Sequence, residues 1–308
     1  MSPDQKSDDA TERAAALQAA IGRQLSRHLG DELGAGLYVV ATPIGNLGDV
    51  TVRALAVLHG ADVVYCEDTR HSLRLFQHYA IRAETRPLHD HNEEAAIARV
   101  LSDLAADKRV ALISDAGTPL ISDPGFKLVR ACTEAGYSVT ALPGASSVIT
   151  ALAVSGLATD AFFFAGFLPP KAQARTSRLQ ELAIVPGSLI FFEAPQRLAE
   201  SLADMAAVLG PRQAVVAREL TKLHEELRRG RLDELAESFS KAEVKGEIVV
   251  VVGPPLAVEV SDDDIAARLA AALATMSLKD AAKAVADALG VSKSRVYDLG
   301  LKVKRERD

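Results

Sequence analysis

The chain has 308 residues, 48% of them hydrophobic, and a formal net charge of −6. This length accommodates two domains and a small appendage with enough apolar side chains to form cores. The charge excludes a surface coated in positive charge but permits RNA binding through a local basic face. No stretch reaches the roughly 20 uninterrupted apolar residues that span a bilayer, so we expect no membrane segment.

The N-terminus and the cysteines indicate the compartment. Residues 1–13 are polar and lack the apolar centre of a signal peptide. Cys66 and Cys132 lie in apolar segments and form no Cys-x-x-Cys pair, which is typical of reduced, buried thiols. We therefore expect a cytoplasmic protein.

Residues 1–34 contain few large apolar side chains. We expect a flexible extension there, in which residues 11–29 can form a helix. From residue 35 to 156, strands alternate with helices, which predicts a parallel α/β domain. The expected strands are residues 37–41, 62–66, 110–113 and 138–142, and the expected helices include residues 51–59, 93–106, 126–135 and a segment ending at residue 156.

Residues 114–125, with the sequence SDAGTPLISDPG, form the most distinctive loop of this region. The loop joins a buried strand to a helix and is longer than most such connections. This arrangement lets backbone amides approach a ligand at the carboxyl end of a sheet. The loop predicts a ligand site without identifying the ligand.

Residues 157–256 repeat the α/β pattern. The expected strands are residues 161–168, 188–194, 214–218 and 248–252, and the expected helices are residues 172–183, 196–209 and 232–239. A Gly-Pro-Pro sequence and the acidic run 262–264 then indicate a linker.

The C-terminal tail, residues 262–308, has a different pattern. Ala286, Gly290 and Val296 stand at the offsets of a helix-turn-helix, in which the glycine forms the turn. The end of the tail is basic through Lys293, Arg295, Lys302, Lys304, Arg305 and Arg307. A structural two-helix cap and a nucleic-acid contact both remain open.

Nine short motifs occur in order between residues 39 and 247. They are VATPIGNLGDVT, YCEDTRHS, LHDHNE, SDAGTPLISDPG, LPGASSVITAL, GFLPPK, FFEAPQR, ARELTK and KGE. Together they resemble the RsmI family of 16S rRNA cytidine 2′-O-methyltransferases, within the tetrapyrrole methylase superfamily. The resemblance implies a parallel-sheet N-terminal domain, a mixed-sheet second domain and a helix-turn-helix-like tail.

The same resemblance implies a homodimer that binds S-adenosylmethionine (SAM) between its two α/β domains. The implied substrate is a cytidine ribose of 16S rRNA in the decoding region of the small ribosomal subunit. The residues implied around SAM are Thr42, Pro43, Ile44, Gly117, Thr118, Ile121, Ser146, Ser147, Phe192, Leu220 and Gly246. Core packing is the alternative for Ile44, Ile121 and Leu220, and helix capping is the alternative for the two serines.

The central loop departs from the wider superfamily at one position. Porphyrin and corrin methylases usually have Gly-Asp-Pro, whereas this chain has Gly117, Thr118 and Pro119. The resemblance therefore leaves open the contact that the superfamily's aspartate makes.

Methyl transfer to a ribose hydroxyl needs a group that accepts the hydroxyl proton. Asp115, Glu219 and Lys222 follow strands that are expected to end at the cleft, so we assign them to the catalytic set. A structural ion pair is the alternative for Glu219.

Four residues are candidates for rRNA contacts: Arg70, His91, Lys171 and Arg175. His89 and His91 could be read as a metal pair, but the sequence offers no third and fourth ligand at suitable spacing, so we expect no metal. Two other functions stay open, a tetrapyrrole or corrin precursor methyltransferase and a ligand-sensing DNA-binding regulator. The Gly117-Thr118-Pro119 sequence and the basic tail count against the first, and the elaborate loops count against the second.

Overall fold

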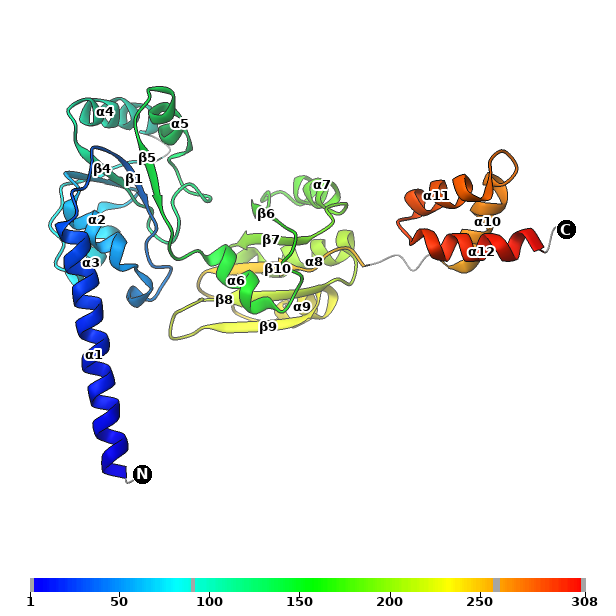
Figure 1. Cartoon of the computed structure of the whole chain (residues 1–308), viewed down its shortest axis with the longest axis horizontal. Helices are drawn as coiled ribbons and strands as arrows, with labels where there is room; N and C mark the ends of the chain where they lie inside the picture. The colour runs from blue at the N-terminus through cyan, green and yellow to red at the C-terminus, as the bar shows by residue number, and fades with distance from the viewer. Residues whose placement is uncertain (1–2, 90–91, 257–260, 306–308) are drawn as a thin grey trace. The chain divides into compact units, whose positions relative to one another are not determined.

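The computed structural model describes residues 3–89, 92–256 and 261–305 (Figure 1). The chain forms two compact units, Met1–Pro255 and Leu256–Asp308. The larger unit contains two five-stranded sheets with their helices, and the smaller unit is helical. Among the described helices, none combines the length and the apolar character that crossing a bilayer requires.

The first sheet is entirely parallel, with the strand order β3-β2-β4-β1-β5. Its strands are β1 (Gly36–Val40), β2 (Val63–Cys66), β3 (Thr85–Pro87), β4 (Arg109–Leu112) and β5 (Val139–Leu142). Its helices are α2 (Val52–Gly60), α3 (Thr69–His78), α4 (Glu93–Ala105) and α5 (Phe126–Glu134), and the next helix along the chain is α6 (Ser147–Ser155).

Alternate side chains of these strands enter separate cores on the two faces of the sheet. Val64 and Ala111 pack with α2 and α3, whereas Val63 and Val110 pack with α4 and α5. Burial on both faces explains why the three central strands, β1, β2 and β4, are almost continuously apolar. The loops after β1 and β4 are neighbours because these two strands pair in the middle of the sheet.

The second sheet is mixed, with the order β6-β7-β10-β8-β9 and a single parallel pair, β6 with β7. Its strands are β6 (Phe162–Phe167), β7 (Ser188–Glu193), β8 (Gln213–Arg218), β9 (Glu226–Arg231) and β10 (Ile248–Val252). Helices α7 (Ala172–Leu182), α8 (Leu198–Leu209) and α9 (Leu232–Phe239) cover one face. Helix α6 packs on the other face, where Ala151 joins Ile190 and Val249 in one core. This helix therefore links the two sheets.

The smaller unit consists of α10 (Asp262–Ala272), α11 (Leu278–Leu289) and α12 (Lys293–Arg305), which share one apolar core. The expected roles within the helix-turn-helix are confirmed: Ala286 and Val296 are buried, and Gly290 is left-handed at the end of α11. The acidic run 262–264, expected in a linker, instead forms the first turn of α10. Ser261 caps that helix, and acidic side chains stabilise a helix N-terminus.

Three further segments differ from expectation. The N-terminal segment forms α1 (Pro3–Gly30), and its side chains from residue 11 onward are exposed apart from the partly buried Leu25 and His28. The short strand β3 was not predicted. Strand β9 was not predicted either. Its sequence, ELRRGR, has a single apolar residue, and the strand lies at the edge of its sheet. The expected two-domain α/β fold with a helical tail is otherwise confirmed.

Candidate functional site

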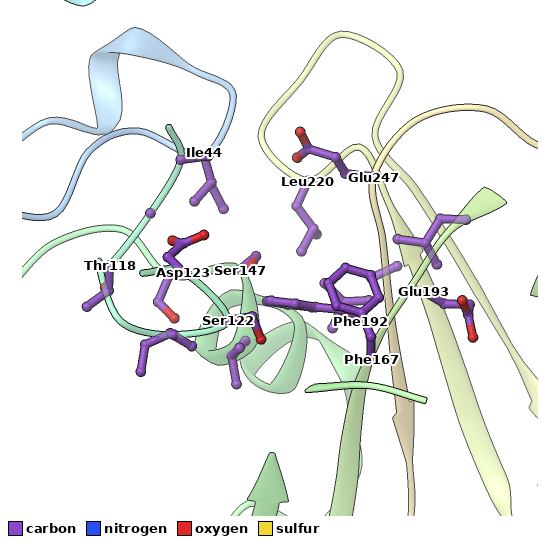
Figure 2. A pocket seen from close by; sticks show the side chains of 18 residues that line it. Ile44, Thr118, Ser122, Asp123, Ser147, Phe167, Phe192, Glu193, Leu220 and Glu247 are labelled. Atoms are coloured by element: carbon purple, nitrogen blue, oxygen red, sulfur yellow. The ribbon is translucent and has the colours of Figure 1, made fainter. Parts of the chain in front are cut away.

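A cavity of about 230 Å³ lies between the two halves of the larger unit (Figure 2). One wall comes from the loops of the first sheet and the start of α6, and the other comes from the second sheet. The first wall consists of Ile44, Ala116, Gly117, Thr118, Ile121, Ser122, Asp123, Ser146, Ser147 and Val148. The second wall consists of Phe167, Phe192, Glu193, Ala217, Leu220, Glu247, Ile248 and Val249.

Backbone hydrogen bonds between two loops fix the first wall. The amide of Thr42 donates to the Gly117 carbonyl at 2.8 Å, and the Gly117 amide donates to Thr42 at 3.0 Å. Gly117 has a φ of 81°, a conformation that favours glycine. A Cβ at this position would lie 3.1 Å from the Ile44 side chain. The wall therefore brings bare backbone to the cavity at Gly117.

The N-terminus of α6 also opens onto this cavity. Ser146 is the N-cap residue by position, yet its side chain makes no capping hydrogen bond. The first amides of a helix have no intrahelical acceptor, and they attract negative charge. Ser146, Ser147 and Val148 all line the cavity, so this helix end suits an anionic group of a ligand.

Aromatic rings form much of the second wall. Phe192 contacts Phe164 and Phe167 edge to face, with ring centroids 4.9 Å and 5.5 Å apart. The neighbouring Glu193 points its carboxylate away from the cavity (Figure 2). That carboxylate accepts hydrogen bonds from Arg197 at 2.6 Å and from Ser201 at 2.5 Å. Glu193 therefore anchors the wall from behind.

Asp123 is a wall residue that the sequence analysis missed. Its side chain is partly buried and points toward the cavity beside Ile44 (Figure 2). Burial raises the pKa of the Asp123 carboxyl to about 6; a hydrogen bond with Ser114 opposes the shift, and the charges of Glu67 and Asp115 add to it. A carboxylate with a pKa near neutrality in a cleft is suited to proton transfer. The sequence around it, Ser-Asp-Pro-Gly, is also typical of an ordinary turn, so the sequence alone did not indicate that Asp123 belongs to a site.

The three expected catalytic residues lie near the cavity but not on its wall. Asp115 accepts a hydrogen bond from the Asp68 amide at 3.1 Å. Lys222 Nζ lies 2.9 Å from Glu219 Oε1 and 3.1 Å from Glu247 Oε2. The backbone amide of Glu247 also donates to Glu219 at 2.9 Å.

These contacts make Glu219 and Lys222 poor proton acceptors. Burial alone would raise the pKa of the Glu219 carboxyl, but hydrogen bonds from Glu247 and Lys222 outweigh it, and this pKa is lowered. Burial alone would lower the pKa of Lys222, but hydrogen bonds to Glu219 and Glu247 raise it. At neutral pH both groups are therefore held in their charged, paired forms.

The residues expected around the cofactor cluster well. Eight of the eleven lie on the wall: Ile44, Gly117, Thr118, Ile121, Ser146, Ser147, Phe192 and Leu220. Thr42, Pro43 and Gly246 do not. Thr42 instead joins the two loops of the first wall through its backbone hydrogen bonds with Gly117. Gly246, with a φ of 93°, packs so close to Glu219 that a Cβ would lie 2.5 Å from that side chain.

The four candidates for rRNA contacts differ in how accessible their side chains are. Arg70 is 90% exposed and pairs with Asp68 at 2.9 Å, and Lys171 is exposed at the start of α7. Arg175 is only 3% exposed and bonds Asp204 at 2.6 Å, so its guanidinium is not available to a phosphate. His91 lies outside the described residues. Within the described part of the chain, no group of three or more His, Cys, Asp or Glu is arranged to hold a metal ion.

Comparisons with known proteins identify similar chains along almost the whole length. Residues 36–236 match the family described as Tetrapyrrole (Corrin/Porphyrin) Methylases, and residues 259–304 match the RsmI C-terminal HTH domain. A ribosomal RNA small subunit methyltransferase I of Mesorhizobium japonicum is 48% identical, over 87% of this chain and 92% of that protein. The protein of the same name from Pseudomonas aeruginosa is also 48% identical, over 86% of this chain and 96% of that protein.

Solved structures share the fold at much lower identity. A uroporphyrin-III C-methyltransferase of Thermus thermophilus, complexed with S-adenyl homocysteine, covers 71% of this chain and 97% of its own, with a TM-score of 0.52 and 22% identity. The methyltransferase CobJ covers 74% of this chain and 97% of its own, with a TM-score of 0.56 and 20% identity. At these identities the likeness establishes the fold alone.

Proposed function

The chain belongs to the ribosomal RNA small subunit methyltransferase I family, and from this premise we propose that it transfers a methyl group from SAM to 16S rRNA. The acceptor that we propose is the 2′-hydroxyl of a cytidine ribose in the decoding region of the small ribosomal subunit. This activity is also what the nine motifs imply. A precursor methyltransferase for tetrapyrroles and a DNA-binding regulator fit the family less well.

The observation that carries the proposal is the cavity between the two halves of the larger unit. Its first wall offers the amides near Gly117 and the N-terminus of α6, which suit a carboxylate such as that of the methionine part of SAM. Its second wall offers the rings of Phe167 and Phe192, which suit a flat base such as adenine. One elongated cofactor with an anionic end and an aromatic end matches these two walls.

SAM, when bound, supplies a methyl group on a positively charged sulfur. The residues of the chain then have two tasks, to hold the two reactants in line and to take the hydroxyl proton. Asp123 is the wall carboxylate suited to the second task, because it faces the cavity and is ionised just above pH 6. Asp115, one of the residues expected from the sequence, stands close enough to affect its charge.

Several groups are proposed to bind the RNA. Arg70 and Lys171 are exposed cations and suit phosphate contacts. The helical unit carries further cations on α12, where Lys293 and Lys302 are exposed. Deletion of the chain after Gly253 should weaken rRNA binding and reduce its dependence on salt, with SAM affinity unchanged. An unaltered salt dependence would make the helical unit a structural cap.

We also propose a homodimer, as the family resemblance implies. The edge strand β6 exposes two phenylalanines outside the cavity, Phe162 at 44% and Phe163 at 39%. Large apolar side chains on a free strand edge favour association. Light scattering on the purified protein should give twice the mass of one chain, and Phe162→Asp with Phe163→Asp should reduce it to the monomer.

Two measurements test the activity. Calorimetry with ligand-free protein should show binding of SAM without added metal, and failure to bind would refute the cofactor assignment. Methyl mapping of small-subunit rRNA from a deletion strain should then reveal one unmethylated cytidine ribose. Restored methylation by the wild-type chain completes the test, and an unchanged rRNA would point to another acceptor.

A further inference from the structure

Two loops meet at the edge of the cavity, one from each half of the larger unit. The amide of Asn46, in the loop after β1, donates to the Thr221 hydroxyl at 3.2 Å. Beside it, Gly45 packs against Lys222 so closely that a Cβ at Gly45 would lie 2.5 Å from Lys222 Cγ. We call these four residues the clasp.

The clasp residues are direct sequence neighbours of a residue on each wall of the cavity. Ile44, on the first wall, precedes Gly45, and Leu220, on the second wall, precedes Thr221. Ile44 and Leu220 also share one apolar core. A shift at the clasp therefore changes the separation of these two wall residues directly.

The backbone on the Thr221 side of the clasp is strained. Glu219 and Thr221 have φ values of 51° and 65°, a region that residues with side chains rarely adopt. Such conformations persist only where the surroundings fix them, and they cluster at functional sites.

Specific bonds hold this strained turn in place. The Thr221 amide donates to the Glu225 carboxylate at 2.6 Å, and the Lys222 amide donates to the Glu219 carbonyl at 3.0 Å. The Lys222 ammonium binds the carboxylates of Glu219 and Glu247. The turn is thus bound on both sides of Leu220, and Lys222 presents its aliphatic stem to Gly45.

We propose that the clasp sets the width of the cofactor cavity, with Gly45, Thr221 and Lys222 as positioning residues. This inference rests on the proposed function, because it concerns the cavity assigned to SAM. It gives Glu219 and Lys222 a role in place of proton transfer: they hold the turn that carries Leu220. Gly45 is required because only a residue without a side chain admits the Lys222 stem.

A pair of glycines supplies the test. Gly45→Ala should push the two walls apart, whereas Gly34→Ala, outside the clasp, adds a Cβ with no heavy atom within 4 Å. We expect Gly45→Ala to lower SAM affinity about tenfold and the single-turnover rate on the order of 10²-fold, the scale of a misplacement near 1 Å. Gly34→Ala should resemble wild type. Hydrogen exchange on the ligand-free proteins should show faster exchange at the Lys222 amide, which donates to the Glu219 carbonyl, in Gly45→Ala alone.

A reversible bond provides a second test that does not depend on loosening the fold. The double variant Asn46→Cys/Thr221→Cys should form a disulfide across the clasp, and the native Cys66 and Cys132 are buried and unpaired. The oxidised protein should bind SAM as well as the reduced one. Loss of SAM binding on oxidation, with recovery on reduction, would mean that the clasp must open, and it would overturn the proposal.

The outcomes separate the two hypotheses. A wild-type chain that fails to bind SAM contradicts the proposed function. A wild-type chain that binds SAM, together with a Gly45→Ala variant that binds it equally well, contradicts the positioning role alone.

Discussion

The two walls of the cavity present different chemical groups, mainly backbone on the first wall and side chains on the second. The first wall follows the carboxyl ends of parallel strands and presents backbone, as at Gly117 and the start of α6. The second wall belongs to a mixed sheet and presents side chains, among them Phe167, Phe192 and Leu220. We infer that the first wall recognises its ligand through amides and the second through shape. Changes at the first wall should therefore matter where they block the backbone, and changes at the second where they remove a side chain.

Gly117→Val should have the largest effect, because it places a side chain where the first wall needs bare backbone. The new Cβ would lie 3.1 Å from the Ile44 side chain and 3.6 Å from the Ala145 carbonyl oxygen, so the valine should displace the wall around it. We expect SAM affinity to fall by at least about 100-fold, measured by calorimetry. Gly136→Val is the matched control, since Gly136 has nearly the same φ, 80° against 81°, with nothing within 4 Å of its Cβ. Equal losses of SAM binding in both variants would trace the effect to backbone strain.

Asp123→Asn tests the one ionisable side chain among the residues of the first wall. The amide cannot accept a proton, so the single-turnover rate should fall on the order of 10²-fold with little change in SAM affinity. In the wild type the rate should rise with pH through about 6, where the carboxyl ionises. The variant should have no such step. A wild-type rate that is flat from about pH 5 to about pH 8, which brackets this pKa on both sides, would contradict the role.

Asp123→Asn should lower the reaction rate but raise the thermal stability of the protein. Because the folded-state pKa of Asp123 is raised from 3.8 to about 6, the folded protein loses stability as pH rises between these two values, and the loss persists above them. Asp123→Asn removes this loss, so the variant should melt at a higher temperature than wild type at pH 7. A residue that merely supports the fold would show the reverse.

The strand pattern predicts where the first wall lies, but the individual wall residues came from the family resemblance. Loops that follow parallel strands meet at one edge, so the long loop at residues 114–125 indicates a ligand site. The resemblance then added Thr118 and Ser147 on the first wall and Phe192 and Leu220 on the second. Phe167 and Ala217 come from strands whose pairing the sequence does not encode locally, and β9 reads as a charged segment. Its arginines are satisfied by tertiary contacts: Arg228 lies over the Phe239 ring at 4.8 Å, and Arg229 donates to carbonyls at the end of α6. The local sequence pattern around β9 does not predict these partners.

Phe192→Ala tests the second wall by removing a ring. The ring contacts two other phenylalanines edge to face and also lines the cavity. We expect SAM affinity to fall about tenfold, which is the usual scale for losing one aromatic contact. Phe126→Ala is the control, because Phe126 is 64% exposed and is not part of the wall. If the two variants bind SAM equally, the second wall does not contact the cofactor.

Ser146→Ala should have the smallest effect and bears most directly on the first wall. An N-cap serine usually stabilises its helix by about 1 kcal/mol through a hydrogen bond to the backbone. Ser146 makes no such bond, whereas Thr51 accepts one from the Ala54 amide at 3.1 Å and caps α2. Denaturant unfolding should therefore show a loss for Thr51→Ala and almost none for Ser146→Ala. If the first wall works through amides, Ser146→Ala should also change SAM affinity less than about threefold. A larger loss of affinity with unchanged stability would mean that the Ser146 hydroxyl itself binds the ligand, and the contrast between a backbone wall and a side-chain wall would fail at that position.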